Sequence, residues 1–123
     1  MLLEVPYSEV LDKWTILELK TTRLPSAEAR RAVVADLNAI KIAWLNEGLP
    51  DPASMDGFDA LRAVNAELWE VEESLRAHER MQSFGDAFVA LARSVYQLND
   101  QRSSLKRALD HKLGSARTEW KSY

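Results

Sequence analysis

The sequence predicts an all-α fold, an antiparallel helical bundle built on a long C-terminal helical hairpin. Apolar residues recur at alternating steps of three and four over long stretches, which is the period of amphipathic helices. Glycines and prolines are clustered between those stretches, which favours long regular elements. We expect one domain, 1–123, with four helices at about 8–24, 26–47, 59–80 and 84–113.

The first expected helix follows Pro6, because the residue before a proline disfavours helix, and Ser8 is its expected N-cap. One apolar stripe runs along this helix, but three further apolar residues lie outside the stripe: Leu11, Ile16 and Leu19. A helix that is apolar on more than one side is usually covered on more than one side. We expect a second copy of the chain to supply that cover, and therefore a homodimer.

The second expected helix takes Ser26 as its N-cap and ends before Gly48, the residue type that favours a helix C-terminus. The segment 48–58 is rich in Gly, Pro and Asp and is the one long loop we expect. Loops of about twelve residues in small domains are often functional, and a plain surface connector is the alternative. The end of the chain, 115–123, is expected to be a tail with a short helical turn.

The third and fourth helices are joined by only a few residues, so they must be antiparallel neighbours. The motif Ser83-x-x-Asp86 resembles a capping box and is expected to open the fourth helix. Each helix carries an apolar seam and, beside it, a second stripe at helical spacing that is mostly polar. The antiparallel register should bring the two stripes together in one groove.

Arg102 interrupts the seam of the fourth helix between Leu98 and Leu105. A buried, unpaired guanidinium would cost several kcal/mol, so Arg102 must have acceptors. The candidates are an anionic ligand, carboxylates of a second chain, or the carboxylates of Asp100, Asp110 and Glu72. A purely structural ion pair is the simplest of these interpretations.

Two further contacts are expected along the groove. Asn65 should face Asn99, either in a hydrogen bond that fixes the register of the hairpin or as part of a polar site. Glu72 and Arg76 are four residues apart in the favourable order for a local ion pair. The candidate binding groove is formed by ten residues: Asn65, Trp69, Glu72, Arg76, Tyr96, Asn99, Asp100, Arg102, Lys106 and Asp110.

The composition excludes several classes of protein. Lys and Arg total 16 against 19 for Asp and Glu, a formal net charge of −3, which disfavours nucleic acid or an anionic membrane as the main partner. There is no cysteine, so disulfides and thiolate catalysis are excluded. The first residues are too short and too acidic for a signal peptide, and no apolar run reaches membrane-spanning length, so we expect a cytoplasmic protein.

We expect neither a metal site nor a cofactor. His78 and His111 lack a His or Glu four residues away on an inward face, and His78 continues a seam, so it should pack at a helix end. Glu-x-x-Glu spacing occurs at Glu67, Glu70 and Glu73, as in magnesium-dependent helical pyrophosphohydrolases, but Glu70 and Glu73 should face water.

Four stretches resemble the bacterial family termed domain of unknown function 6165. They are Val10–Lys20, Asn65–Arg76, Phe88–Arg102 and Glu119–Tyr123. The chain departs from the family pattern at Glu73, where Asp is usual, and at Trp120, where Glu is usual. The family has no assigned activity; the resemblance implies a bacterial cytoplasmic protein, sometimes placed near sugar-transfer and envelope-polysaccharide functions.

Three functions are compatible with these residues. The first is a non-catalytic module that binds a protein or a small anionic ligand through the charged groove. The second is a small helical enzyme that holds a phosphorylated or dicarboxylate substrate, by analogy of residue types with chorismate-type mutases. The third is a dimeric scaffold. The residues adequate for the enzyme are Glu72, Arg76, Asn99, Arg102 and Lys106.

Overall fold

The computed structural model describes residues 1–114, in which there are four α-helices, one short 3₁₀ helix and no strand. The elements are α1 (Tyr7–Arg23), α2 (Ala27–Asn46), η1 (Pro52–Ser54), α3 (Phe58–Arg80) and α4 (Asp86–Leu113). The predicted all-α fold is confirmed. The expected tail, with Trp120 and the resembling stretch Glu119–Tyr123, lies outside the described residues.

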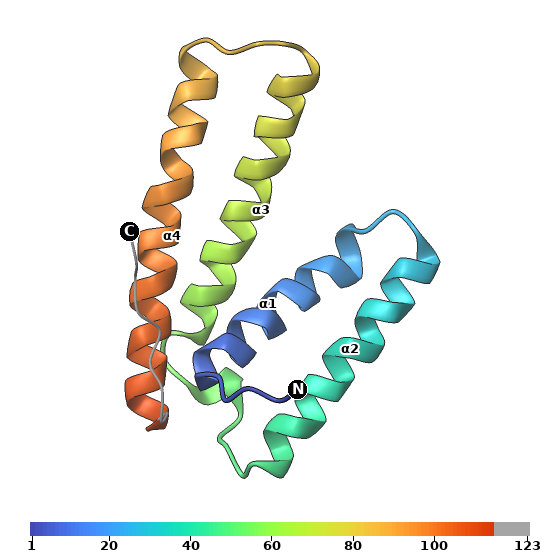
Figure 1. Ribbon diagram of the computed structural model, residues 1–123, viewed down its shortest axis with the longest axis vertical. Helices are drawn as coiled ribbons and strands as arrows, with labels where there is room; N and C mark the ends of the chain where they lie inside the picture. Colours follow the sequence, from blue (N-terminus) through green and yellow to red (C-terminus); the bar gives the residue numbers. More distant parts are fainter. Residues whose placement is uncertain (115–123) are drawn as a thin grey trace.

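The helices form two antiparallel hairpins, α1–α2 and α3–α4 (Figure 1). The antiparallel pairing of α3 with α4 is the one predicted from their short link. Helix α1 contacts all three of the other helices. It crosses the half of the α3–α4 hairpin that lies away from the tip, and the tip half of α4 stands clear of α1 and α2 (Figure 1).

The core joins the two hairpins through α1. Its central cluster takes side chains from every α-helix: Leu11, Trp44, Phe58, Leu61 and Leu109. On α1, Leu11 is buried and Ile16 and Leu19 are half-buried. Since the other three helices of the same chain pack on α1, this helix does not require a second copy to cover it, and the homodimer stays a prediction.

The ends of α2 follow the predicted local chemistry. The Oγ of Ser26 accepts a hydrogen bond from the backbone N–H of Ala29 at 3.2 Å, as an N-cap does. Gly48 has a φ of +73°, the left-handed conformation that lets glycine follow a helix C-terminus. The loop that follows packs on the core, because the indole N–H of Trp44 donates to the Pro50 carbonyl at 2.7 Å.

The predicted capping box at Ser83 is wrong. The backbone N–H of Ser83 donates to the His78 carbonyl at 2.9 Å, and that of Gln82 donates to the Glu79 carbonyl at 3.1 Å. These two bonds, with Gln82 at a φ of +53°, form a Schellman motif that closes the end of α3. Ser83 therefore serves the preceding helix, and α4 begins after Gly85, two residues later than expected.

Candidate functional site

Helix α1 presents a row of polar side chains to the α3–α4 hairpin. Ser8, Asp12 and Thr15 are spaced by four and three residues, which places them on one face of the helix. Their exposed fractions are 0%, 4% and 0%. Buried polar groups require hydrogen-bond partners, and α3 and α4 supply them.

Asp12 is the acceptor that Arg102 requires. One carboxylate oxygen accepts from the Nε of Arg102 at 2.9 Å, and the other is ion-paired with its Nη2. This is the two-pronged arrangement in which a guanidinium binds a carboxylate most strongly. The prediction that Arg102 is paired is confirmed, and its side chain is half-buried. Asp12, however, is not among the carboxylates that the sequence predicts for this role.

The two asparagines reach this ion pair from opposite helices. The amide nitrogen of Asn65 donates to Asp12 Oδ1 at 2.8 Å and to Thr15 Oγ1 at 2.7 Å. The amide oxygen of Asn99 accepts from Arg102 Nη1 at 3.3 Å. The structure thus brings Asn65 and Asn99 to one place, but Asn65 donates to α1 instead of to Asn99, because an anionic carboxylate is the stronger acceptor.

Lys106 and Asp110 extend the same contact toward the start of α1. The Nζ of Lys106 lies 2.6 Å from Glu9 Oε1 and 3.6 Å from Asp12 Oδ2. Asp110 accepts the backbone N–H of Ser8 at 2.9 Å and its hydroxyl at 2.8 Å. Ser8 is therefore not the N-cap that we predict from the sequence. It lies in the first turn, where a carboxylate from α4 binds an N–H of the positive helix end.

We refer to this set of side chains as the junction: Ser8, Glu9, Asp12, Thr15, Asn65, Asn99, Arg102, Lys106 and Asp110. Throughout residues 1–114, every buried side-chain nitrogen or oxygen has a hydrogen-bond partner. The four junction residues on α1 are the ones that sequence reasoning missed. A signal was present, because Ser8, Asp12 and Thr15 form a polar stripe at helical spacing.

The electrostatics of the junction keep Asp12 ionised. Burial by itself would raise the pKa of Asp12, but hydrogen bonds from Arg102 and Asn65, with the charges of Arg102 and Lys106, outweigh it and hold the pKa below its ordinary value. Asp12 is therefore a weak base that stays negative at neutral pH.

This shift predicts how stability depends on acid. As the pH falls, Asp12 takes up its proton in the unfolded chain before it does so in the folded chain. The contribution of Asp12 to the free energy of unfolding is therefore complete above its ordinary pKa of 3.8 and is lost as the pH falls through its lower pKa in the folded protein. We expect the stability gap between the wild type and Asp12→Asn, measured by urea unfolding, to shrink between about pH 7 and about pH 2. A gap that is constant over this range would contradict the prediction.

Trp69 and Arg76 lie outside the junction, at the fork where the two hairpins diverge. Here the end of α1 and the turn after it meet α3 around a cleft of about 530 Å³. We refer to it as the fork cleft, lined by Arg23, Leu24, Pro25, Trp69, Glu70, Glu73 and Arg76.

Two ion pairs lie in the fork cleft, Arg23 with Glu70 and Arg76 with Glu73. The expected ion pair of Arg76 with Glu72 is wrong, because the salt bridge uses the residue three positions before the arginine. The hydrogen bond from Arg76, together with its charge, lowers the pKa of Glu73.

The predicted groove is thus not one surface. Five of its ten residues are in the junction and two are in the fork cleft. Of the remaining three, Glu72 and Tyr96 are exposed and Asp100 is half-buried on α4. The predicted charged groove is therefore divided between the junction, where the helices pack together, and the fork cleft, which is open to solvent.

No group of three or more His, Cys, Asp or Glu side chains in residues 1–114 is arranged to hold a metal ion. The ring of His78 lies against Phe88, and its Nδ1 is 3.0 Å from the Ser83 carbonyl oxygen, so its predicted packing at a helix end is confirmed. Glu70 and Glu73 are exposed, as expected, but both also line the fork cleft.

Within the described part of the chain, every helix falls short of the length and apolar character that crossing a membrane requires. Comparisons with protein-family models, curated proteins and solved structures found no match to this chain. The fold and the junction define a two-hairpin all-α protein. Its resemblance to the family of unknown function stays a prediction.

Proposed function

We propose that this protein is a non-catalytic interaction module that binds a partner protein at the fork cleft. The observation that carries the proposal is the fork cleft itself, where half-buried Trp69 lies with Arg23 and Arg76 at an open surface. Tryptophan and arginine are the residue types most enriched where protein interfaces gain their binding energy.

The charges of the cleft favour a polypeptide over a small anion. Two arginines and two glutamates cancel, and each arginine is already paired with a glutamate. A phosphorylated or dicarboxylate ligand would have to displace a carboxylate and would then face its repulsion. A protein segment can offer apolar groups to Trp69 and charges of both signs to the rim.

The junction supports the non-catalytic interpretation. A general acid or base works best when its pKa is near the working pH, and the pKa of Asp12 is shifted away from that range. The cations on which the enzyme alternative depends, Arg102 and Lys106, are engaged with carboxylates of α1. By joining α1 to α3 and α4, these contacts also fix the relative position of the two hairpins.

The test is site-specific photo-cross-linking in cells of the source organism. A photoreactive phenylalanine at position 69 is expected to capture one defined protein, and the same probe at the exposed Ile42 of α2 serves as the control. Capture should be lost when Arg76→Glu is added, because it places a third carboxylate in the cleft. Identification of the captured protein would also test the link to envelope polysaccharide that the family resemblance implies.

Two results would contradict this proposal. One is the same cross-linked products from positions 69 and 42. The other is a thermal shift of the purified protein with phosphorylated sugars, nucleotides or dicarboxylates that Arg76→Ala or Arg102→Met abolishes, which would support the enzyme alternative.

A further inference from the structure

The tip half of α4 carries a face that no other helix within residues 1–114 covers. In the other half, α1 contacts Lys106 and Asp110, which share one stripe of α4 with Ser103 and Asn99. The stripe continues toward the tip with the same steps of four and three, through Tyr96, Ala92, Val89 and Gly85. We refer to these four residues as the upper stripe. Figure 1 shows that α1 does not reach this part of α4.

The upper stripe differs from the outer surface of α3 beside it. Tyr96 is 54% exposed and Val89 is 50% exposed. The only charged residues of α4 between 86 and 97 are Asp86 and Arg93. The exposed positions of α3 between 67 and 80 are instead almost all charged: Glu67, Glu70, Glu72, Glu73, Arg76, Glu79 and Arg80. The surface of α3 is thus suited to water, whereas that of α4 is suited to another helix.

The tip half of the hairpin is also incompletely packed. No residue between 69 and 97 is fully buried, and the seam side chains Val71, Leu75, Leu91 and Val95 remain half-buried. A pair of helices leaves the edges of the apolar seam between them exposed to solvent. In a four-helix bundle the neighbouring helices cover those edges.

We propose that the upper stripe binds the upper stripe of a second copy of this chain, with the two α4 helices antiparallel about a two-fold axis. In that register Tyr96 lies over Gly85 of the second copy, and Val89 lies over Ala92. A Cβ placed on Gly85 would meet no atom of the described residues within 4 Å, so there is space for the ring. Large residues therefore meet small ones at both ends of the contact.

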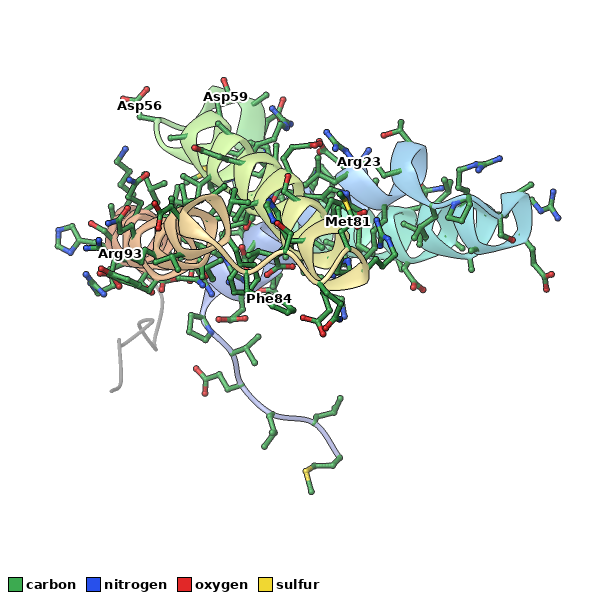
Figure 2. All side chains as sticks on the ribbon, turned by 90° about the horizontal axis from the view of Figure 1, so that it is seen from above. Arg23, Asp56, Asp59, Met81, Phe84 and Arg93 are labelled. Carbon is green, nitrogen blue, oxygen red and sulfur yellow. The ribbon has the colours of Figure 1, made fainter. Side chains whose placement is uncertain are left out.

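The charges at the edge of the stripe favour the same orientation. Asp86 and Arg93 are seven residues apart, so they lie along one edge of the helix. An antiparallel two-fold pair places Asp86 of each copy near Arg93 of the other. In a parallel two-fold pair the two charged edges would lie on opposite sides of the dimer, and these charges would not meet. Figure 2 shows Arg93 at the edge of the molecule opposite α2, where a second copy can approach.

The contact involves about twelve residues of each α4, roughly 18 Å of helix. An interface of this length is smaller than the standard size of stable complexes. The dimer is therefore weak and concentration-dependent. It uses a surface separate from the fork cleft, so partner capture at position 69 and self-association can each fail without the other.

The test is sedimentation equilibrium over roughly 10 to 200 µM with exchanged charges. Arg93→Asp and Asp86→Arg are each expected to weaken the dimer about tenfold, because each turns two attractive pairs into repulsive ones. The double variant should recover to within about threefold of the wild type. Glu67→Arg on the outer face of α3 is the matched control. Circular dichroism verifies that every variant is folded.

Disulfide trapping tests the register, since the chain has no cysteine of its own. A mixture of Val89→Cys and Ala92→Cys chains is expected to form the mixed disulfide in preference to either homodimer. A wild type that stays monomeric throughout, single charge variants that associate like the wild type, or trapping only of like with like would each overturn the proposal.

Discussion

Replacing Asp12 with alanine is expected to lower the free energy of unfolding by about 3 kcal/mol. The change removes the acceptor of Arg102 and of Asn65 and takes a negative charge from Lys106. Loss of one member of a buried ion pair leaves the other charge desolvated without compensation. We expect the lower end of the usual range because Arg102 keeps part of its contact with water.

Urea unfolding measures this effect, and Asp36→Ala on the exposed surface of α2 is the matched control, expected to change stability by less than about 0.5 kcal/mol. Asp12→Leu combined with Arg102→Met should recover much of the loss, because an apolar pair of similar volume often replaces a buried ion pair without cost. Equal losses for Asp12→Ala and Asp36→Ala would show that the junction does not hold the hairpins together.

Trp44→Ala is expected to lower the free energy of unfolding by about 4 kcal/mol. The side chain is 2% exposed, packs edge-on against the rings of Tyr7 and Trp14 at 6.0 and 6.3 Å, and donates to the Pro50 carbonyl. Its loss would open a cavity between α1 and α2 and would detach the loop after α2.

The neighbouring Leu45 is 71% exposed, so Leu45→Ala provides a control of the same helix with an expected change within about 0.5 kcal/mol. The two variants should differ in urea midpoint and in the near-ultraviolet circular dichroism of the aromatic cluster. Similar midpoints would mean that the aromatic contacts of Trp44 contribute little to the stability of the fold.

Local patterns were reliable for most of the features that one segment alone decides. The period of the apolar residues located all four α-helices, and Ser26 and Gly48 marked the ends of α2. The Ser83 motif failed for a physical reason that is also local: the residue lies between two helices, and its N–H closes the first of them.

The candidate site was predictable only in part. Arg102 lies in the apolar seam of α4, where an unpaired charge would be costly. The sequence therefore shows that Arg102 needs a partner. The identity of that partner does not follow, because Asp12 is 90 residues away and reaches Arg102 only through the way α1 crosses the hairpin. The same crossing separates Trp69 and Arg76 from the junction and leaves them in an open cleft.

By itself, the sequence determined the all-α fold, the antiparallel α3–α4 hairpin and the need of Arg102 for a partner, because periodicity, a short link and desolvation act along one stretch of chain. Tertiary structure alone decided which carboxylate binds Arg102, that α1 is covered by its own chain, and which part of the polar stripe stays open. These outcomes depend on how α1 packs across the other helices, and the side chains that fix this packing lie far apart in sequence.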